Sequence, residues 1–392
     1  MSSKQDFQIK KGVLLKYLGS ETSVCVPDGV LKIGDNAFWA LEGLTDVFLP
    51  ESVTEIGEGA FSKCTSLERI NIPSSVTQIG KRAFYECRSL TSIVIPDGVT
   101  RICYATFSRC KNLTSVTISK NVTSIEQSAF FSCECLSNVI IPDKVKEIGS
   151  SAFFYCQALT HISIPKEVTR IESGTFTSCI NLKEVSLLGN VTEIGEEAFH
   201  GCRSLQNFTI PDGVIRINKE AFFLCESLTN IKIPDSVTEI GDNAFEDCTG
   251  LTSITIPANV KKIGDEAFKS CKNLSRVEFI KPCPKLGEWA FAGCSKLTFS
   301  TEDLAAFVLY QSSFWWKITI KSHLTDENTA PVAERMVAIL QNLKKIGSKT
   351  GIYAAEFFTE HSGLIPPETL EALRVVLTEK KCEKALEALH TS

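Results

Sequence analysis

Cysteine is the residue type in this chain that is best suited to metal binding or redox chemistry, because thiolates bind metal ions and thiols form disulfides. The chain has 16 cysteines, and eleven of them stand 23 residues apart without interruption. Eleven equivalent thiols define no unique disulfide pairing, and the series lacks the C-x₂-C pairs typical of zinc ligands. We therefore expect buried free thiols, which favour a reducing compartment. The series is Cys64, Cys87, Cys110, Cys133, Cys156, Cys179, Cys202, Cys225, Cys248, Cys271 and Cys294.

Histidine is the residue type most often used for acid–base catalysis, and the chain has only five histidines. His161 and Ser163 stand two residues apart on an expected strand, so both side chains should point to the same exposed face. A catalytic Ser–His pair also needs a positioned acid and an oxyanion hole, and the sequence argues for neither. Patterns for zinc proteases, phosphate-binding loops, nucleophile elbows and calcium loops do not occur. We expect no enzyme activity, no cofactor and no metal site.

Overall charge and hydropathy exclude some classes of binding partner and favour one cellular compartment. Forty-one basic and 46 acidic residues give a net charge of -5, which disfavours binding to nucleic acid. No apolar run reaches the roughly 18 residues of a membrane helix, so we expect no membrane insertion. The first ten residues have no apolar segment of a signal peptide. A cytoplasmic location is favoured, with non-classical export to the surface as the alternative.

The 23-residue period extends well beyond cysteine. A strand is predicted over residues 251–256 of one unit, ended by Pro257, which has no N–H to donate. Val260 and Ile263 return the chain to the interior, and residues 265–270 read as a single helical turn. Phenylalanine recurs with the same step at Phe38, Phe61, Phe84, Phe107, Phe130, Phe153, Phe176, Phe199, Phe222, Phe245, Phe268 and Phe291.

Twenty-three residues cannot bury about eight apolar side chains alone, but stacked identical units bury them continuously. The repeat therefore predicts an α/β leucine-rich-repeat solenoid of about twelve units. We expect a parallel β-sheet on its concave side, short helical turns on the other side, and a small helical domain at the C-terminus. The position before Ile-Gly often holds a glutamate, and we interpret these glutamates as solvated edge residues.

The repeated pattern Leu-x-x-Ile-x-Ile-Pro-x-x-Val-x-x-Ile-Gly-x-x-Ala-Phe-x-x-Cys resembles the BspA-type (Treponema pallidum-type) leucine-rich repeats. The resemblance runs from Val24 to Phe299. Departures are few, such as Leu41 in place of the first cysteine. The resemblance implies a solenoid that binds partner proteins, and it implies that surface adhesins binding host matrix proteins are common relatives.

Four parts of the chain are expected. Residues 1–23 form an N-terminal cap hairpin, 24–299 the solenoid, 300–325 a C-terminal cap and 326–392 a small helical domain. The C-terminal cap should contain a short helix over 302–310 and a strand over 314–320, with Trp315 and Trp316 in its core.

The first candidate binding surface is the outward side of the predicted sheet. Its exposed positions are weakly polar with apolar exceptions, which suits a protein or a glycan. The candidate residues there are Val94, Thr117, Ile140, His161 and Ser163.

The second candidate surface is the position after each repeated phenylalanine. Ser62 and Ser108 at this position imply that it is exposed, yet other units place aromatic residues there. These rings form either a contiguous exposed interaction patch or a layer that packs onto adjacent turns. The candidates are Tyr85, Phe131, Phe154 and Phe223, with Tyr155 beside Phe154.

Three functions are consistent with the sequence. The first is a non-enzymatic scaffold that presents the sheet to a protein partner, with the aromatic residues as a second surface if they form an exposed patch. The alternative is a cell-surface adhesin that binds host matrix proteins or glycans. A remote alternative is a regulatory or enzymatic activity in the C-terminal helices.

Overall fold

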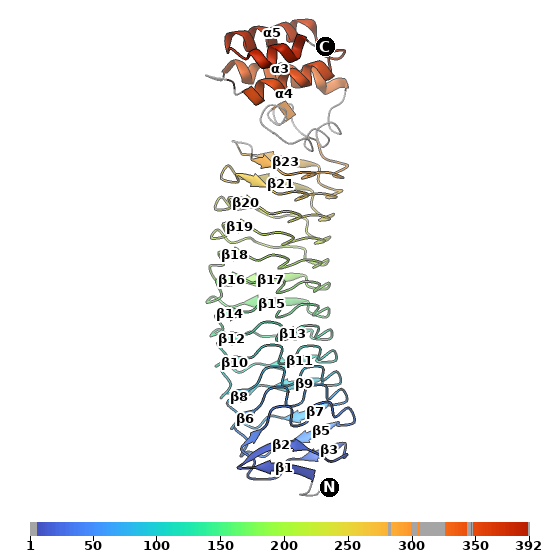
Figure 1. Ribbon diagram of the computed structural model, residues 1–392, viewed down its shortest axis with the longest axis vertical. Coiled ribbons are helices and arrows are strands. Elements are labelled where there is room, and N and C mark those ends of the chain that lie inside the picture. Colours follow the sequence, from blue (N-terminus) through green and yellow to red (C-terminus); the bar gives the residue numbers. More distant parts are fainter. Residues whose placement is uncertain are drawn as a thin grey trace.

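The computed structural model describes residues 6–280, 284–298, 304–305, 326–342, 346 and 348–390. Successive 23-residue units form coils that stack into a long column, with the N-terminus at one end (Figure 1). This confirms the predicted repeat solenoid. We number the units 1 to 12 by their repeated phenylalanine, from Phe38 to Phe291.

The predicted strands of ten units form a first parallel ladder along the column, and units 9 and 10 contribute single bridges at Asn207 and Asn230. Equivalent residues of neighbouring coils pair directly, as Ser115 does with Ser92 and Asn138. The paired strands alternate buried and exposed residues, as the period-2 pattern predicted. They are β3 (Ser23–Cys25), β5 (Asp46–Phe48), β7 (Arg69–Asn71), β9 (Ser92–Val94), β11 (Ser115–Thr117), β13 (Asn138–Val139), β15 (His161–Ile164), β17 (Glu184–Leu187), β21 (Ser253–Ile256) and β23 (Arg276–Phe279).

A second parallel ladder runs along the column, and the sequence analysis missed it. Its strands are only two residues long, which is too short to show a period of two. Their pairing is again one unit apart, as for Glu193 and Arg216. The strands are β4 (Lys32–Ile33), β6 (Glu55–Ile56), β8 (Gln78–Ile79), β10 (Arg101–Ile102), β12 (Ser124–Ile125), β14 (Glu147–Ile148), β16 (Arg170–Ile171), β18 (Glu193–Ile194), β19 (Arg216–Ile217), β20 (Glu239–Ile240), β22 (Lys262–Ile263) and β24 (Lys285–Leu286).

The second ladder changes the role of its glutamates. Glu55 binds Lys32 at 2.5 Å, and Glu239 binds Arg216 at 2.9 Å. These two carboxylates pair with cations of neighbouring coils, whereas the equivalent Glu147 is exposed, so the interpretation as solvated edge residues describes only part of the series. The glycine that follows several of these strands is required because the backbone of the preceding coil lies very close to it. A Cβ on Gly149, for example, would lie 2.4 Å from the backbone N of Gln127.

The segment expected to be a helical turn differs from a helix. In unit 2 it consists of consecutive turns in which Gly59 and Lys63 have φ values of 59° and 63°. Its N–H groups alternate: that of Ser62 donates to Gly59 within the coil, and that of Phe61 donates to Ala83 of the next coil at 2.8 Å. A helix would use these donors internally, so the turns connect the coils where a helix would not.

The repeated phenylalanines form the centre of the core. All twelve are fully buried, and neighbouring rings stack with centroids 4.9–5.7 Å apart. Tyr17 continues the stack beyond Phe38 at 5.4 Å. It belongs to a hairpin of β1 (Phe7–Lys10) and β2 (Val13–Tyr17), whose second strand pairs with β4. The hairpin thus lies against the first coil.

The cysteine series forms a parallel ladder beside the rings. Each thiol is free and buried, as predicted, and its Sγ donates to the phenylalanine carbonyl of the preceding unit at 3.0–3.3 Å. The carbonyl of Phe61, for example, accepts both the Cys64 N–H and the Cys87 thiol at 3.1 Å. Leu41 takes the cysteine position in unit 1, where the preceding segment is the hairpin and has no repeated phenylalanine.

Four helices follow the solenoid in the chain and pack on one another, as the helical spacing predicted. They are α3 (Asp326–Asn342), α4 (Ser348–Glu360), α5 (Pro367–Glu379) and α6 (Glu383–His390). In the part of the chain that the structure describes, no helix is long and apolar enough to cross a membrane. The predicted cap strand with Trp315 and Trp316 lies outside the described residues, and the four domain boundaries stay a prediction.

Candidate binding surfaces

The outward side of the first ladder, which we call the strand face, carries exposed apolar side chains. Val94 is 62% exposed and Ile140 is 77% exposed, with Thr117 between them on the intervening strand. A hollow of about 670 Å³ lies beside Ile140. Phe48, which is 51% exposed, adds a residue that the sequence analysis missed. It occupies the same repeat position as Val94, and comparing units at that position would have found it.

His161 and Ser163 lie further along the strand face on β15, and both are exposed as predicted. The Nδ1 atom of His161 lies 3.0 Å from the hydroxyl of Thr160. Within the described ranges, no hydrogen bond joins His161 to Ser163. Their register partners are Glu184 and Ser186 on β17. The two residues are therefore part of a polar strand surface.

The position after the repeated phenylalanine is not generally exposed, so that premise was wrong. Ser62 and Ser108 are only 6% and 4% exposed. A small polar residue at this position is therefore no sign of contact with solvent.

The predicted aromatic residues at this position are half-buried and partly contiguous. Phe131 and Phe154 stack with centroids 4.7 Å apart and an interplanar angle of 7°. Tyr155, which is 37% exposed, lies 6.4 Å from Phe154. Phe223 stacks on His200 at 4.7 Å. Phe131, Phe154 and Tyr155 therefore pack on adjacent turns and form one contiguous surface, whereas Phe223 stacks separately on His200. The role of these rings in binding stays a prediction.

A hollow of about 550 Å³, which we call the aromatic groove, crosses the turn segments of units 1 to 5. Tyr85 and Phe131 line it, together with Trp39 at the same repeat position. Other lining residues were not assigned to a site by the sequence analysis, and they include Tyr104, Lys63, Arg82 and Arg109. Each cation lies over a ring. Lys63 Nζ is 5.9 Å from the Trp39 centroid, Arg82 Cζ is 5.2 Å from Tyr104, and Arg109 Cζ is 5.9 Å from Tyr85.

One nearly buried carboxylate fixes part of this groove. Glu86 accepts from Arg88 at 3.0 Å and from Arg109 at 3.1 Å. Burial alone would raise the pKa of Glu86, but hydrogen bonds from Tyr85, Arg88 and Arg109 outweigh burial and hold the pKa below its usual value. The ionised carboxylate therefore orients Arg109 beside the Tyr85 ring.

The turn segments further along the column have the opposite charge. In units 2 to 4 the segments 57–66, 80–89 and 103–112 carry six basic and two acidic residues. In units 8 to 11 the segments 195–204, 218–227, 241–250 and 264–273 carry nine acidic and four basic residues. The turn side is therefore basic and aromatic near the N-terminus and acidic toward the C-terminus.

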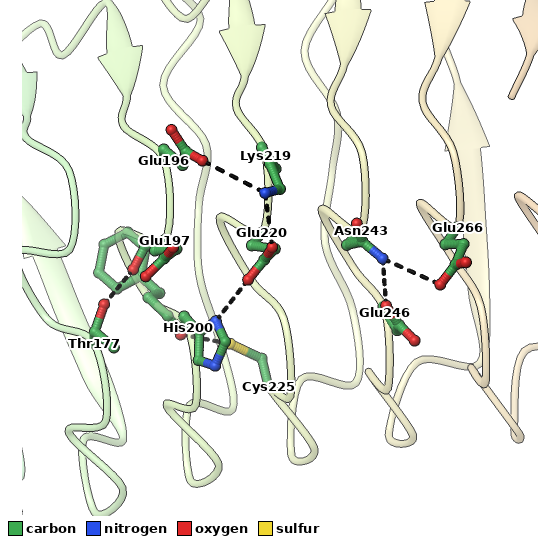
Figure 2. Close-up of polar contacts among 11 residues, drawn as sticks. Thr177, Glu196, Glu197, His200, Lys219, Glu220, Cys225, Asn243, Glu246 and Glu266 are labelled. Atoms are coloured by element: carbon green, nitrogen blue, oxygen red, sulfur yellow. Dashed lines mark hydrogen bonds and ion pairs between the residues drawn. The ribbon is translucent and has the colours of Figure 1, made fainter.

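Figure 2 shows the acidic part of the turn side. Lys219 bridges Glu196 at 3.8 Å and Glu220 at 3.3 Å, and Glu220 lies 3.2 Å from His200 Nδ1. In the next unit, the Asn243 amide donates to Glu246 at 2.5 Å and to Glu266 at 3.3 Å (Figure 2). These carboxylates are held by internal contacts.

Comparison with known proteins decides the family. Residues 15–122, 102–227 and 192–321 match the BspA type leucine rich repeat region, in six copies. The chain belongs to the BspA-type leucine-rich repeat family. The resemblance read from the repeated pattern is thereby confirmed.

Three solved leucine-rich repeat proteins are similar to this chain. A leucine-rich repeat protein from Bacteroides ovatus is 31% identical, with a TM-score of 0.59 over 71% of this chain and 78% of that chain. The T. pallidum leucine rich repeat protein is 32% identical, with a TM-score of 0.40 over 53% and 91%. A leucine rich cell surface protein from Faecalibacterium prausnitzii is 31% identical, with a TM-score of 0.45 over 71% and 92%. No curated protein gives a significant match.

Proposed function

We propose that this BspA-type protein is a non-enzymatic scaffold that binds a partner protein through its strand face. The observation that carries the proposal is the row of exposed apolar side chains at one repeat position, Phe48, Val94 and Ile140, in alternate units 2, 4 and 6. Large apolar side chains gathered on an otherwise polar surface mark interaction sites.

The geometry of the strand face supports this role. Phe48 lies on β5, which pairs with β3 on one side and β7 on the other, and Val94 on β9 is held in register with Thr117 on β11. Ile140 directly follows β13, which also pairs with β11. A rigid surface loses little conformational freedom on binding, so more of the interaction energy is available for affinity. The hollow beside Ile140 offers a recess for one side chain of the partner.

Site-specific photo-crosslinking in the cells that make the protein tests this proposal. A photo-reactive residue at Ile140 should yield a defined adduct with one partner, whereas the same residue at Thr255, on the same face in unit 11, should not. Adding Val94→Asp should weaken the Ile140 adduct by about tenfold, because it places a charge in the apolar contact. Equal adducts from both positions, or an adduct insensitive to Val94→Asp, would contradict the proposal.

We infer, as a separate proposal, that the protein works in the cytoplasm. The support is the ladder of eleven buried free thiols, which suits a reducing compartment. Surface-protease treatment of intact cells should leave the untagged protein intact, and the same protease should degrade it after lysis. Degradation in intact cells would favour a surface location and the adhesin alternative.

A further inference from the structure

The turn segments of successive units form the turn side of the column. Figure 2 shows several of them side by side in one row, from Thr177 of unit 7 to Glu246 of unit 10. The turn segments of units 2 to 4 carry six basic and two acidic residues, and those of units 8 to 10 carry seven acidic and two basic residues. These two oppositely charged groups lie at equal distances on either side of unit 6. A role of the strand face does not explain this arrangement.

Both groups contain charges without an opposite charge in the chain. Across the residues that the structure describes, no carboxylate lies within ion-pair distance of Lys81 or Arg82 in unit 3. Both side chains are exposed, and Arg82 lies over the Tyr104 ring, 5.2 Å from its centroid. In the acidic group, no lysine or arginine of the described ranges lies within ion-pair distance of Glu197 or Asp247. These cations and carboxylates are therefore available to charges outside the chain.

Unit 6, midway between the two groups, carries aromatic surface. Tyr155 is 37% exposed and lies 6.4 Å from Phe154, which stacks on Phe131 of unit 5. Aromatic side chains are enriched at protein–protein interfaces. The acidic residues of the adjoining turn segments 126–135 and 172–181 are already paired within the chain. They are Glu126, Glu134 and Glu172, which contact Arg101, Lys111 and Arg170.

We propose that two copies of this chain associate through their turn sides as an antiparallel dimer. A two-fold axis at unit 6, perpendicular to the column, places units 2 to 4 of each copy against units 8 to 10 of the other. Opposite charges then meet at both ends of the contact, and the aromatic surface of units 5 and 6 lies at its centre. The same surface serves both copies, as in most homodimers. A parallel pair would instead place basic units on basic units.

The turn side is large enough for a stable dimer. A standard interface buries about 800 Å² on each partner, so nine units in contact need to bury about 90 Å² each. A single aromatic side chain can bury about 150–250 Å². The strands of the first ladder are not part of this contact. The proposed role of the strand face therefore does not depend on the dimer, and it stays possible in both copies.

A second copy fits these charges better than other partners do. A nucleic acid would be attracted to units 2 to 4 and repelled by units 8 to 10. A protein with one sign of charge along its surface would also meet repulsion at one end. An inverted copy of this chain presents the complementary charge at both ends.

Sedimentation velocity of the full chain tests this proposal. At about 20 mM salt, the chain should approach twice the mass of one copy as its concentration rises from about 1 to about 100 µM. At about 500 mM salt the dissociation constant should be at least about tenfold higher, because salt screens exposed charge pairs. A monomer at every concentration, or a dimer that becomes tighter at high salt, would overturn the proposal.

Two double variants exchange the charges of the two groups. Lys81→Glu with Arg82→Glu places in unit 3 the residue types that unit 8 has at the same repeat positions. Glu197→Arg with Asp247→Lys uses those that units 3 and 2 have at the corresponding positions. Each variant alone should raise the dissociation constant at least about tenfold. An equimolar mixture of the two should dimerise about as tightly as the unmodified chain, because each reversed group then meets its complement.

Lys183→Glu with Lys232→Glu is the matched control, because it changes the net charge equally through exposed lysines outside the turn segments. It should leave the dissociation constant within about twofold. Tyr155→Ser matches the serines at the same position in units 5 and 7, and should weaken the dimer by about tenfold. Thermal unfolding checks that each variant is folded, and Tyr155→Ser and the salt dependence keep the test open if a charge variant misfolds. An equal effect of the control, or a mixture of folded charge variants that stays monomeric, would also overturn the proposal.

Discussion

Raising the pH from about 8 to about 10 is expected to unfold the repeat region, because the unfolded chain can ionise thiols that the folded chain holds neutral. Burial raises the pKa of the Cys64 and Cys179 thiols to about 12, from an ordinary value of 9.0. A hydrogen bond with Cys294, followed by burial, raises the pKa of Cys271. Burial also raises the pKa of Cys87, Cys110, Cys133, Cys156, Cys202, Cys225 and Cys248.

The sign follows from the direction of these shifts. Because the pKa of each thiol is higher in the folded state, its stabilising contribution is fully present below about pH 9 and is lost as the pH rises from about 9 toward about 12. At about pH 10 the loss is about 1.4 kcal/mol per thiol, or about 14 kcal/mol for ten thiols. This is comparable to the whole free energy of unfolding of an ordinary domain, which is about 5–15 kcal/mol.

Circular dichroism melts at increasing pH, read together with the ultraviolet absorbance of thiolate, measure this effect. Thiolate absorbance from the ladder should appear only as the protein unfolds. The triple variant Cys110→Ser, Cys133→Ser and Cys156→Ser is the control, because a hydroxyl can still donate to the phenylalanine carbonyl but does not titrate in this range. The stability of this variant should fall with rising pH about a third less steeply than that of the unmodified protein. Ladder thiolate in the folded protein would contradict the prediction.

Phe153→Ala is expected to destabilise the solenoid by about 3–5 kcal/mol. The ring is fully buried and lies between Phe130 at 5.4 Å and Phe176 at 5.7 Å, so its removal leaves a cavity that no side chain of unit 6 can fill. Each coil contacts only its neighbours, so the cavity also weakens the coupling between the two halves of the column. Urea unfolding should show a lower midpoint and a broader or two-step transition.

Ile140→Ala is the matched control for Phe153→Ala, because it removes a large apolar side chain from the same unit. Ile140 is mostly exposed, so its truncation should change the free energy of unfolding by no more than about 0.5 kcal/mol. A similar loss of unfolding free energy in both variants would mean that the stacked rings do not contribute more to stability than exposed apolar side chains do.

The repeat made much of this fold predictable. Every interior coil has nearly the same two neighbours, so a residue type repeated at one position, such as Phe153 or Cys156, shows how that position is used in every coil. Outward positions of the first strand were also predictable, because alternation is a local property of a strand. Val94 and Ile140 were found in this way, and both are exposed.

Contacts between side chains of neighbouring coils were harder to predict from the sequence. Ser62 is only 6% exposed, and it lines a hollow together with Trp39 and Tyr85, which lie one unit before and one unit after it. A residue read within its own unit therefore appeared exposed when it was covered. For the same reason, the sequence analysis grouped the aromatic residues into one patch and overlooked the hollow that Tyr85 and Phe131 line.

The sequence alone determined the 23-residue period, the stacked solenoid, the buried rings and the free thiols, because these follow from what one unit must bury against copies of itself. Tertiary structure decided the second strand ladder, the left-handed residues that let turn N–H groups connect the coils, and the aromatic groove, in which Lys63 lies over Trp39 and Arg82 over Tyr104. Each of these arises between residues about 23 positions apart, where neither local conformational preference nor periodicity specifies which side chains meet.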